Sequence, residues 1–187
     1  AMNPETLASF LGSVTLGDVY KDYRKETFPV RWEKKYLSLK IPELTILQTP
    51  KDGDKFIYAR FSNDEVCNSR KFLNELDHHL ASQFPDTEEV KPAFGKVIKL
   101  YLPYKEGRIS YRKFHIYDSD KNEVEIQELK ENSRIKALAC LSQYKRYCDE
   151  IIPVWCLGLI QMIKEEATPA AAEAAADEIV EPPEEEE

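Results

Sequence analysis

The sequence has few glycines and few histidines, and these shortages exclude several classes of enzyme. With 6 glycines in 187 residues, it contains neither a GxGxxG segment nor a P-loop, so no glycine-rich loop is available to cradle a phosphate. The HExxH and GxSxG motifs are absent too. Of the three histidines, His78 and His79 are neighbours on a predicted helix and point in different directions. We therefore predict a non-catalytic protein that uses no cofactor and no metal.

Paired cysteines and long apolar runs are also missing. The four cysteines are Cys67, Cys140, Cys148 and Cys156, and no two of them form a CxxC pair. Three of them fall in or near apolar stretches, which favours buried thiols in an intracellular, reducing compartment over disulfides or metal ligation. No apolar run approaches the roughly 20 residues of a membrane span, so we expect no membrane partner. One alternative stays open, an enzyme that brings His115 together with Cys140 or Cys148.

The negative charge is concentrated at the C-terminal end. Residues 165–187 hold ten acids and no Lys or Arg. Without them, 24 acids face 26 Lys and Arg, so residues 1–164 carry about +2 although the whole chain has a formal net charge of −8. A nearly neutral domain with basic stretches and an acidic tail is typical of proteins that handle nucleic acid. In such proteins the tail competes with phosphate for a basic groove or recruits partners.

Hydrophobic periodicity predicts strands on both sides of one helix. Alternating apolar residues predict strands over residues 36–41, 44–48 and 55–61, with breaks at Pro42-Glu43 and Asp52-Gly53. Apolar residues three to four apart then predict a helix that begins at Asn68 or Ser69 and ends at Pro85. Four more strands are predicted over residues 97–102, 111–117, 135–144 and 154–163.

These elements predict a mainly β fold with one central helix. Strands, a helix after the third strand and then more strands make up the order of an OB-type barrel, although other small barrels and α+β folds share this order. We divide the chain into three parts. They are an N-terminal arm or short helix (1–30), an OB-like barrel domain (31–164) and a disordered acidic tail (165–187).

Basic and aromatic residues alternate most densely between Lys99 and Tyr117. Successive side chains of a strand point to opposite faces. One surface of a two-stranded ribbon would therefore present Lys99, Tyr101, Tyr111, Lys113, His115 and Tyr117, with Ile98, Leu100 and Leu102 on the other surface. Lysines bind the phosphate backbone, and rings stack on unpaired bases with about 1–3 kcal/mol per base. The alternative is that these are ordinary residues of a half-exposed sheet.

Two further segments repeat this chemistry. Tyr144, Lys145, Arg146 and Tyr147 end a predicted strand, where a loop would let them clamp a backbone, and Lys34, Lys35 and Tyr36 extend the basic surface. The sequence leaves open whether Trp32 and Trp155 stack on bases or belong to the core, although a tryptophan among apolar neighbours more often packs in a core. Three separate clusters favour nucleic-acid binding over an ordinary sheet surface.

The C-terminal half also resembles a known family. The run from Lys130 to Leu138, followed by the run from Val154 to Ile163 with Trp155, Leu157 and Gln161, is similar to the closing strands of OB-fold single-stranded DNA-binding proteins of large eukaryotic DNA viruses. Residues 114–128 fit an edge hairpin of that arrangement. One departure is the segment 150–153, where a glycine is expected. The resemblance implies non-catalytic, sequence-tolerant coating of single strands in replication, recombination or packaging.

We therefore expect a single-stranded DNA-binding protein with nucleic-acid-binding residues Lys34, Lys35, Tyr36, Lys99, Tyr101, Tyr111, Lys113, Tyr117, Tyr144, Lys145, Arg146 and Tyr147. Stacking and phosphate contacts do not sense the 2′-hydroxyl, so RNA is an equally compatible partner on these grounds. Replication proteins are candidate partners of the acidic tail. If the protein is viral, we expect it at the replication site of the host cell and in the virion. The alternative function is a structural or adaptor module whose acidic tail is a docking peptide.

Overall fold

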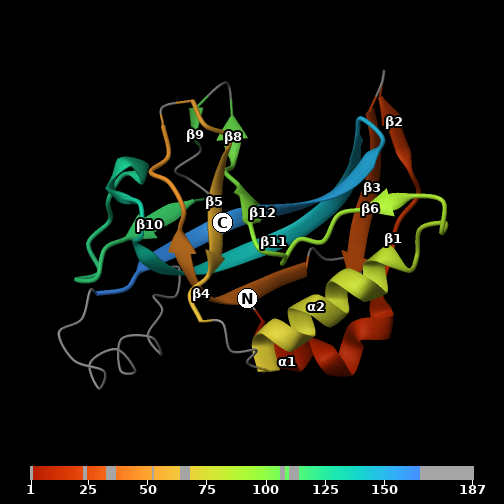
Figure 1. Cartoon of the computed structure of the whole chain (residues 1–187), viewed down its shortest axis with the longest axis horizontal. Coiled ribbons are helices and arrows are strands. Elements are labelled where there is room, and N and C mark those ends of the chain that lie inside the picture. The colour runs from red at the N-terminus through yellow and green to blue at the C-terminus, as the bar shows by residue number, and fades with distance from the viewer. Residues whose placement is uncertain are drawn as a thin grey trace.

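A computed structural model of the chain describes residues 2–22, 25–32, 37–51, 53–63, 68–105, 108–109 and 114–164 (Figure 1). The predicted tail, 165–187, lies outside these residues. The helices are α1 (Pro4–Leu7), η1 (Ala8–Ser13), α2 (Asn68–Ala81) and η2 (Ile126–Glu128). The strands are β1 (Val14–Leu16), β2 (Tyr20–Asp22), β3 (Lys25–Trp32), β4 (Leu37–Ile46), β5 (Phe56–Phe61), β6 (Glu89–Val90), β7 (Ile98–Tyr101), β8 (Tyr104–Lys105), β9 (Arg108–Ile109), β10 (His115–Tyr117), β11 (Arg134–Tyr147) and β12 (Glu150–Met162). The prediction of a mainly β fold is confirmed.

Five strands pair in a closed order. β4 pairs with β5 and β5 with β7, both antiparallel. β7 runs parallel to β12, β12 pairs antiparallel with β11, and β11 returns antiparallel to β4. Their alternate residues are apolar and buried, as Leu37, Leu39 and Ile41 of β4 show. Burial of one face of every strand in this order creates a single core.

One long strand, β12, organises the rest of the sheet. Along one edge it pairs with β11, and it also pairs in parallel with three short strands in succession. β6 pairs at Glu150 and Ile151, β7 at Cys156, and β10 from Leu159 to Gln161. The predicted ribbon of residues 97–102 with 111–117 is therefore wrong for the part of it that is described, because β7 and β10 both pair with β12 at different places.

The β11–β12 hairpin extends beyond the closed order of strands (Figure 1). We call residues 142–153 of this hairpin, together with β2 and β3, the arm. β3 pairs with β11 through Phe28 opposite Tyr144, and β2 pairs with β3. The sequence predicted a loop between residues 144 and 154, whereas both strands continue to a two-residue turn. That prediction failed because β3 and β6, which supply partners to this segment, were not recognised.

β4 is a single strand where the sequence predicted two. Ile135 of β11 faces Leu44 and Ala137 faces Ile41, so the register shifts by one residue between them. Pro42 lies opposite this shift. Proline has no N–H to donate to the ladder, and irregular positions of this kind are where a strand tolerates it. Because residues 37–46 form one strand instead of two, α2 follows the second strand of the closed order, rather than the third as predicted.

The long helix α2 covers the core as its periodicity predicted (Figure 1). Leu73, Leu76 and Leu80 are buried, and the helix ends at Ala81, before the predicted Pro85. Beyond its end, the Gln83 side chain donates to Val14 O at 3.1 Å and accepts from Leu16 N at 3.0 Å. Gln83 thus bonds the backbone of β1 as a neighbouring strand would, and it fixes the N-terminal segment to the helix.

Asp77 of α2 fixes the segment that leads into β7. Its carboxylate accepts hydrogen bonds from the backbone N–H groups of Ala93 at 3.1 Å and Phe94 at 3.0 Å. Burial raises the pKa of Asp77 from 3.8 to about 6, and the two N–H groups oppose this rise. The helix therefore carries a partly buried acid whose protonation is linked to folding.

Large aromatic side chains fill the core. Trp155 is 2% exposed and Phe114 is fully buried. The Trp155 ring lies 5.2 Å from that of Phe94, so Trp155 is a core residue. Trp32 is half-buried and its ring lies 6.1 Å from that of Phe10. No helix in the described part of the chain is long and apolar enough to cross a membrane.

Candidate nucleic-acid interface

The outer surface of β5 and β7 carries aromatic rings and a lysine. Ile98, Leu100 and Leu102 are buried, while Lys99 and Tyr101 are half-buried on the opposite face. This confirms the facing predicted for residues 98–102. In the neighbouring strand, Phe56 is directly opposite Tyr101 and Tyr58 is opposite Lys99. Because opposed residues share a face of the sheet, all four side chains lie on one surface.

The cations of this surface lie over its rings. Lys99 Nζ is 3.9 Å from the centroid of the Phe56 ring and 5.2 Å from that of Tyr101. Lys145 Nζ, which comes from the arm, is 4.8 Å from the centroid of Tyr101. The rings of Phe56 and Tyr101 are 5.8 Å apart, and those of Phe56 and Tyr58 are 5.2 Å apart. We call Phe56, Tyr58, Lys99, Tyr101 and Lys145 the aromatic–lysine face.

The hydroxyl of Tyr101 has an unusual position within this face. It is buried and has no hydrogen-bond partner among the described residues. An unpaired buried hydroxyl costs about 1–3 kcal/mol, so the ring rather than the hydroxyl accounts for the packing at this site. The substitution Tyr101→Phe therefore keeps the ring and removes an unfavourable polar atom.

Alternation divides the predicted clamp of residues 144–147 between two surfaces. Tyr144 points inward, is 1% exposed, and has its ring 5.4 Å from that of Phe84. The prediction that Tyr144 contacts nucleic acid is therefore wrong, because its ring is part of the core. Lys145 and Tyr147 lie on the outer surface of the same strand, and Tyr147 is 63% exposed. The role of these two residues in binding nucleic acid stays a prediction.

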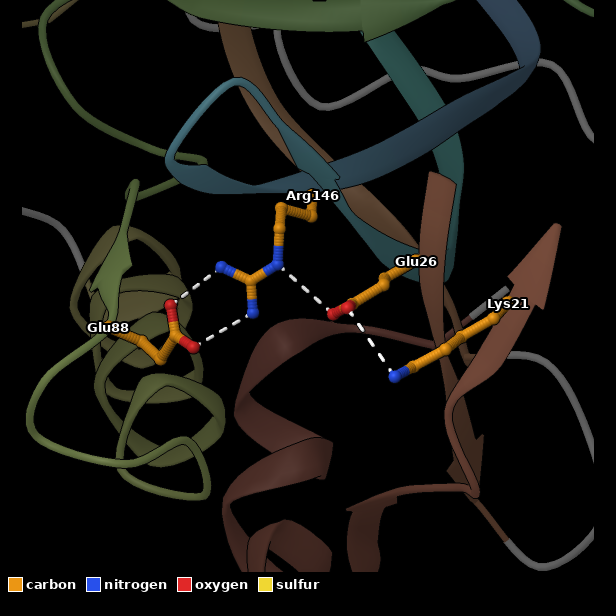
Figure 2. Close-up of polar contacts among 4 residues, drawn as sticks. All are labelled: Lys21, Glu26, Glu88 and Arg146. Atoms are coloured by element: carbon orange, nitrogen blue, oxygen red, sulfur yellow. Dashed lines mark hydrogen bonds and ion pairs between the residues drawn. The ribbon is translucent and has the colours of Figure 1, made fainter. Parts of the chain in front are cut away.

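Arg146 belongs to an ion-pair network on the other side of the arm (Figure 2). Its guanidinium donates two hydrogen bonds to the Glu88 carboxylate, at 2.7 and 2.8 Å, and one to Glu26 at 3.0 Å. Lys21 Nζ lies 3.8 Å from Glu26. The hydrogen bonds that Arg146 donates to Glu88, and then the one to Glu26, raise the pKa of Arg146, and accepting from Arg146 lowers the pKa of Glu88.

The partners of Arg146 correct its predicted role. Two carboxylates already accept from the guanidinium, so binding a phosphate there would mean giving up charge-assisted hydrogen bonds. Arg146 instead joins the turn before β6 to β3 and β11. It is a structural residue of the arm, and the predicted clamp is reduced to Lys145 and Tyr147.

The outer surface of the arm carries one more exposed ring. Tyr20 of β2 is opposite Thr27 of β3, and Thr27 is opposite Lys145 of β11. Tyr20 is 64% exposed. Since opposed residues share a face, Tyr20 and Lys145 lie in one row across three strands. The row leads from the edge of the arm to Tyr101.

Tyr117 lies apart from the aromatic–lysine face. It is opposite Gln161 of β12, whereas Tyr101 is opposite Cys156. Five residues of strand separate these positions, or roughly 15 Å. The Tyr117 ring stacks on His115 at 6.3 Å, and His115 Nδ1 is 2.8 Å from a carboxylate oxygen of Glu123. Tyr117 bridges to Glu123, consistent with the hairpin expected over residues 114–128. The structure therefore does not join Tyr117 to Tyr101.

The remaining predicted residues lie outside the described part of the chain. They are Lys34, Lys35, Tyr36, Tyr111 and Lys113. Across the described residues, no group of three or more His, Cys, Asp or Glu side chains is placed to hold a metal ion.

Sequence reasoning missed Phe56 and Tyr58 as members of this face. Both could have been found, because residues 56–61 alternate between outward and buried side chains just as residues 98–101 do. No protein-family model matches the chain, and no curated protein matches it.

Proposed function

We propose that this protein binds single-stranded DNA without catalysis and with little dependence on sequence, through the aromatic–lysine face. The observation that carries the proposal is the set of three rings and two lysines gathered on one surface from β5, β7 and the arm. In the free protein the ammonium groups lie over the rings. When single-stranded DNA binds, its bases take the place of the ammonium groups over the rings, and the lysines pair with phosphates.

The strand order supports an OB-like barrel. Numbered along the chain, β4, β5, β7, β11 and β12 are strands one to five, and they pair in the order 1-2-3-5-4-1, with the third and fifth parallel. This is the pairing of an OB barrel. The helix differs, since α2 follows the second strand instead of the third. In OB folds, oligonucleotides bind the face of strands two and three and the loop between strands four and five. Here those elements are β5, β7 and the arm.

Single strands suit this surface better than duplex. The rings offer stacking only to bases that are not already stacked on neighbours, and each stacked base contributes about 1–3 kcal/mol. Two lysines add salt-sensitive phosphate contacts. Because neither contact reads base edges, the proposed role is coating of single strands in replication, recombination or packaging, within the cell and with the tail recruiting replication proteins.

A binding titration tests this proposal. A fluorescent oligonucleotide of about 30 bases, longer than the roughly 4–16 nucleotides that one OB fold covers, is titrated as single strand and as duplex over a series of salt concentrations. We expect the single strand to bind more tightly, and its affinity to fall as salt rises.

Two variants of one residue identify the surface. Tyr101→Ala removes the ring and should weaken binding by about 5- to 100-fold, whereas Tyr101→Phe keeps the ring and should bind as the unaltered protein does. Circular dichroism establishes that both variants are folded. Equal binding by the two folded variants would remove the aromatic–lysine face from the proposal. No binding of either strand would favour the adaptor function instead.

A further inference from the structure

Two cysteines face each other across the β11–β12 hairpin. Cys140 of β11 is directly opposite Cys156 of β12, and both are free and half-buried. Opposed residues of antiparallel strands have Cα atoms about 4.5–5.5 Å apart and side chains on the same face. A disulfide needs Cα atoms about 4.4–6.8 Å apart. The register thus meets the backbone requirement of a disulfide without rearrangement of the hairpin.

We propose that Cys140 and Cys156 form a thiol-modification site, which a low-molecular-weight disulfide such as oxidised glutathione converts reversibly into a cross-strand disulfide. The proposal rests on the register of the hairpin and does not depend on nucleic-acid binding. The two other cysteines are not part of the site. Cys148 lies in the exposed turn of the arm, and Cys67 lies outside the described residues.

The reaction consists of two exchanges. The Cys156 thiol loses its proton to solvent, and its sulfur attacks oxidised glutathione, forming a mixed disulfide and releasing one glutathione thiolate. The Cys140 thiol then loses its proton and attacks the Cys156 sulfur, which releases the second glutathione thiolate. The protein dithiol is oxidised by two electrons, and one molecule of oxidised glutathione is reduced to two of glutathione.

The surroundings of the thiols set the order and the speed of these steps. Burial raises the pKa of Cys140 to about 11, with a smaller contribution from Cys156. Burial also raises the pKa of Cys156, but a hydrogen bond from Ser142 opposes that rise. Cys156 is therefore the first nucleophile. Because the thiolate is the reactive form, disulfide formation should be slow at pH 7 and faster at pH 9.

The test uses the full chain with Cys67→Ser and Cys148→Ser, so that only the proposed pair remains. The folded protein is incubated with oxidised glutathione at pH 7 and pH 9. We expect both thiols to disappear without a glutathione adduct, so the mass falls by about 2 Da for the lost hydrogens. Peptide mapping should show a bond between Cys140 and Cys156, and dithiothreitol should restore both thiols.

Single substitutions provide the control. Adding Cys140→Ser or Cys156→Ser to the same background should leave only a mixed disulfide with glutathione, and where the serine variant does not fold, the alanine variant replaces it. The proposal is overturned if the folded protein keeps both thiols at pH 9 while the urea-unfolded protein forms the bond. Glutathione adducts on both cysteines, or a bond between two molecules, would overturn it as well.

Discussion

Lys145 and Arg146 are adjacent cations whose surroundings give them different properties. Lys145 lies over an aromatic ring on the outer surface of the arm, while Arg146 donates to two carboxylates on the other side. A cation held by carboxylates is a poor phosphate ligand, because binding must first break charge-assisted hydrogen bonds. At the scale of the residue, the partners of a basic side chain therefore decide its role more than its position in a basic sequence.

Substituting each cation by methionine separates binding from stability. Lys145→Met should reduce the affinity for single-stranded DNA severalfold and the slope of log K against log salt by roughly 0.7, and it should lower the thermal unfolding midpoint less than Arg146→Met does. Arg146→Met leaves Glu26 and Glu88 without their shared partner and should lower the midpoint. Titrations over a salt series and thermal melts measure both effects. A larger loss of affinity in Arg146→Met than in Lys145→Met, with both proteins folded, would contradict the assignment.

Asp77 should make the stability of the protein depend on pH near neutrality. Its folded-state pKa of about 6 is higher than the unfolded value of 3.8. The folded state therefore binds the proton more tightly, and protonated Asp77 adds to the free energy of unfolding. This stabilisation is complete below pH 4 and is lost as the pH rises through 6. Asp77→Asn removes the buried charge and should be about 1–3 kcal/mol more stable than the parent at pH 8, with no such difference at pH 4.

Urea unfolding of both proteins at several pH values measures this difference. The other carboxylates contribute equally to the stability of the two proteins. The pH dependence of the difference in unfolding free energy between them therefore reports on Asp77 alone. A difference that does not vary between pH 4 and pH 8 would show that the carboxyl titrates alike in the folded and unfolded states.

At the scale of the element, the turn of the arm is a point of backbone strain. Tyr147 and Glu150 are paired, which leaves Cys148 and Asp149 as the turn, and Cys148 has a φ of 55°. A side chain in this left-handed region costs about 1 kcal/mol or more, whereas glycine adopts it freely. The turn thus places a strained residue at the end of the longest hairpin in the described chain.

Cys148→Gly should stabilise the protein by up to about 1 kcal/mol, since glycine removes the strain at the cost of some entropy in the unfolded chain. Cys148→Val should destabilise it, because a β-branched residue tolerates a positive φ least. Urea denaturation under reducing conditions measures both. Equal stability of the glycine and valine variants would show that the turn is not strained.

The elements that the sequence predicted best were those with a clear period. Leu73, Leu76 and Leu80 marked the buried side of α2, and residues 98–102 alternated as the structure shows. The arm was missed because residues 20–32 have no regular alternation, and because residues 27–29 pair with a strand more than 110 residues later in the chain. Alternation would also have separated Tyr144 and Arg146 from Lys145, but the segment was interpreted as a loop, where no alternation applies.

At the scale of the whole molecule, the charge of the acidic tail opposes that of the proposed interface. Residues 165–187 carry ten acids and no Lys or Arg. We propose that this tail competes with phosphates for the lysines of the aromatic–lysine face, in which case the competition is strongest where screening is weakest. Deleting residues 165–187 should therefore raise the affinity for single-stranded DNA, most clearly at low salt.

Titration of the full chain and the truncated chain at about 20 and 200 mM salt, on either side of physiological screening, measures the effect. A variant with the ten acids changed to glutamine and asparagine keeps the length of the tail and is the matched control. An affinity that is the same for all three proteins at low salt would exclude competition by the tail.

The position of β12 in the sheet also bears on how the chain folds as it is synthesised. β6, β7, β10 and β11 all pair with β12, and it follows every one of them in the sequence. Until residues 150–162 have left the ribosome, the edges at which these four strands pair with β12 have no partner. Because exposed edges attract other chains, the nascent protein is most prone to aggregation at that stage. Rapid completion of this one strand then closes the sheet.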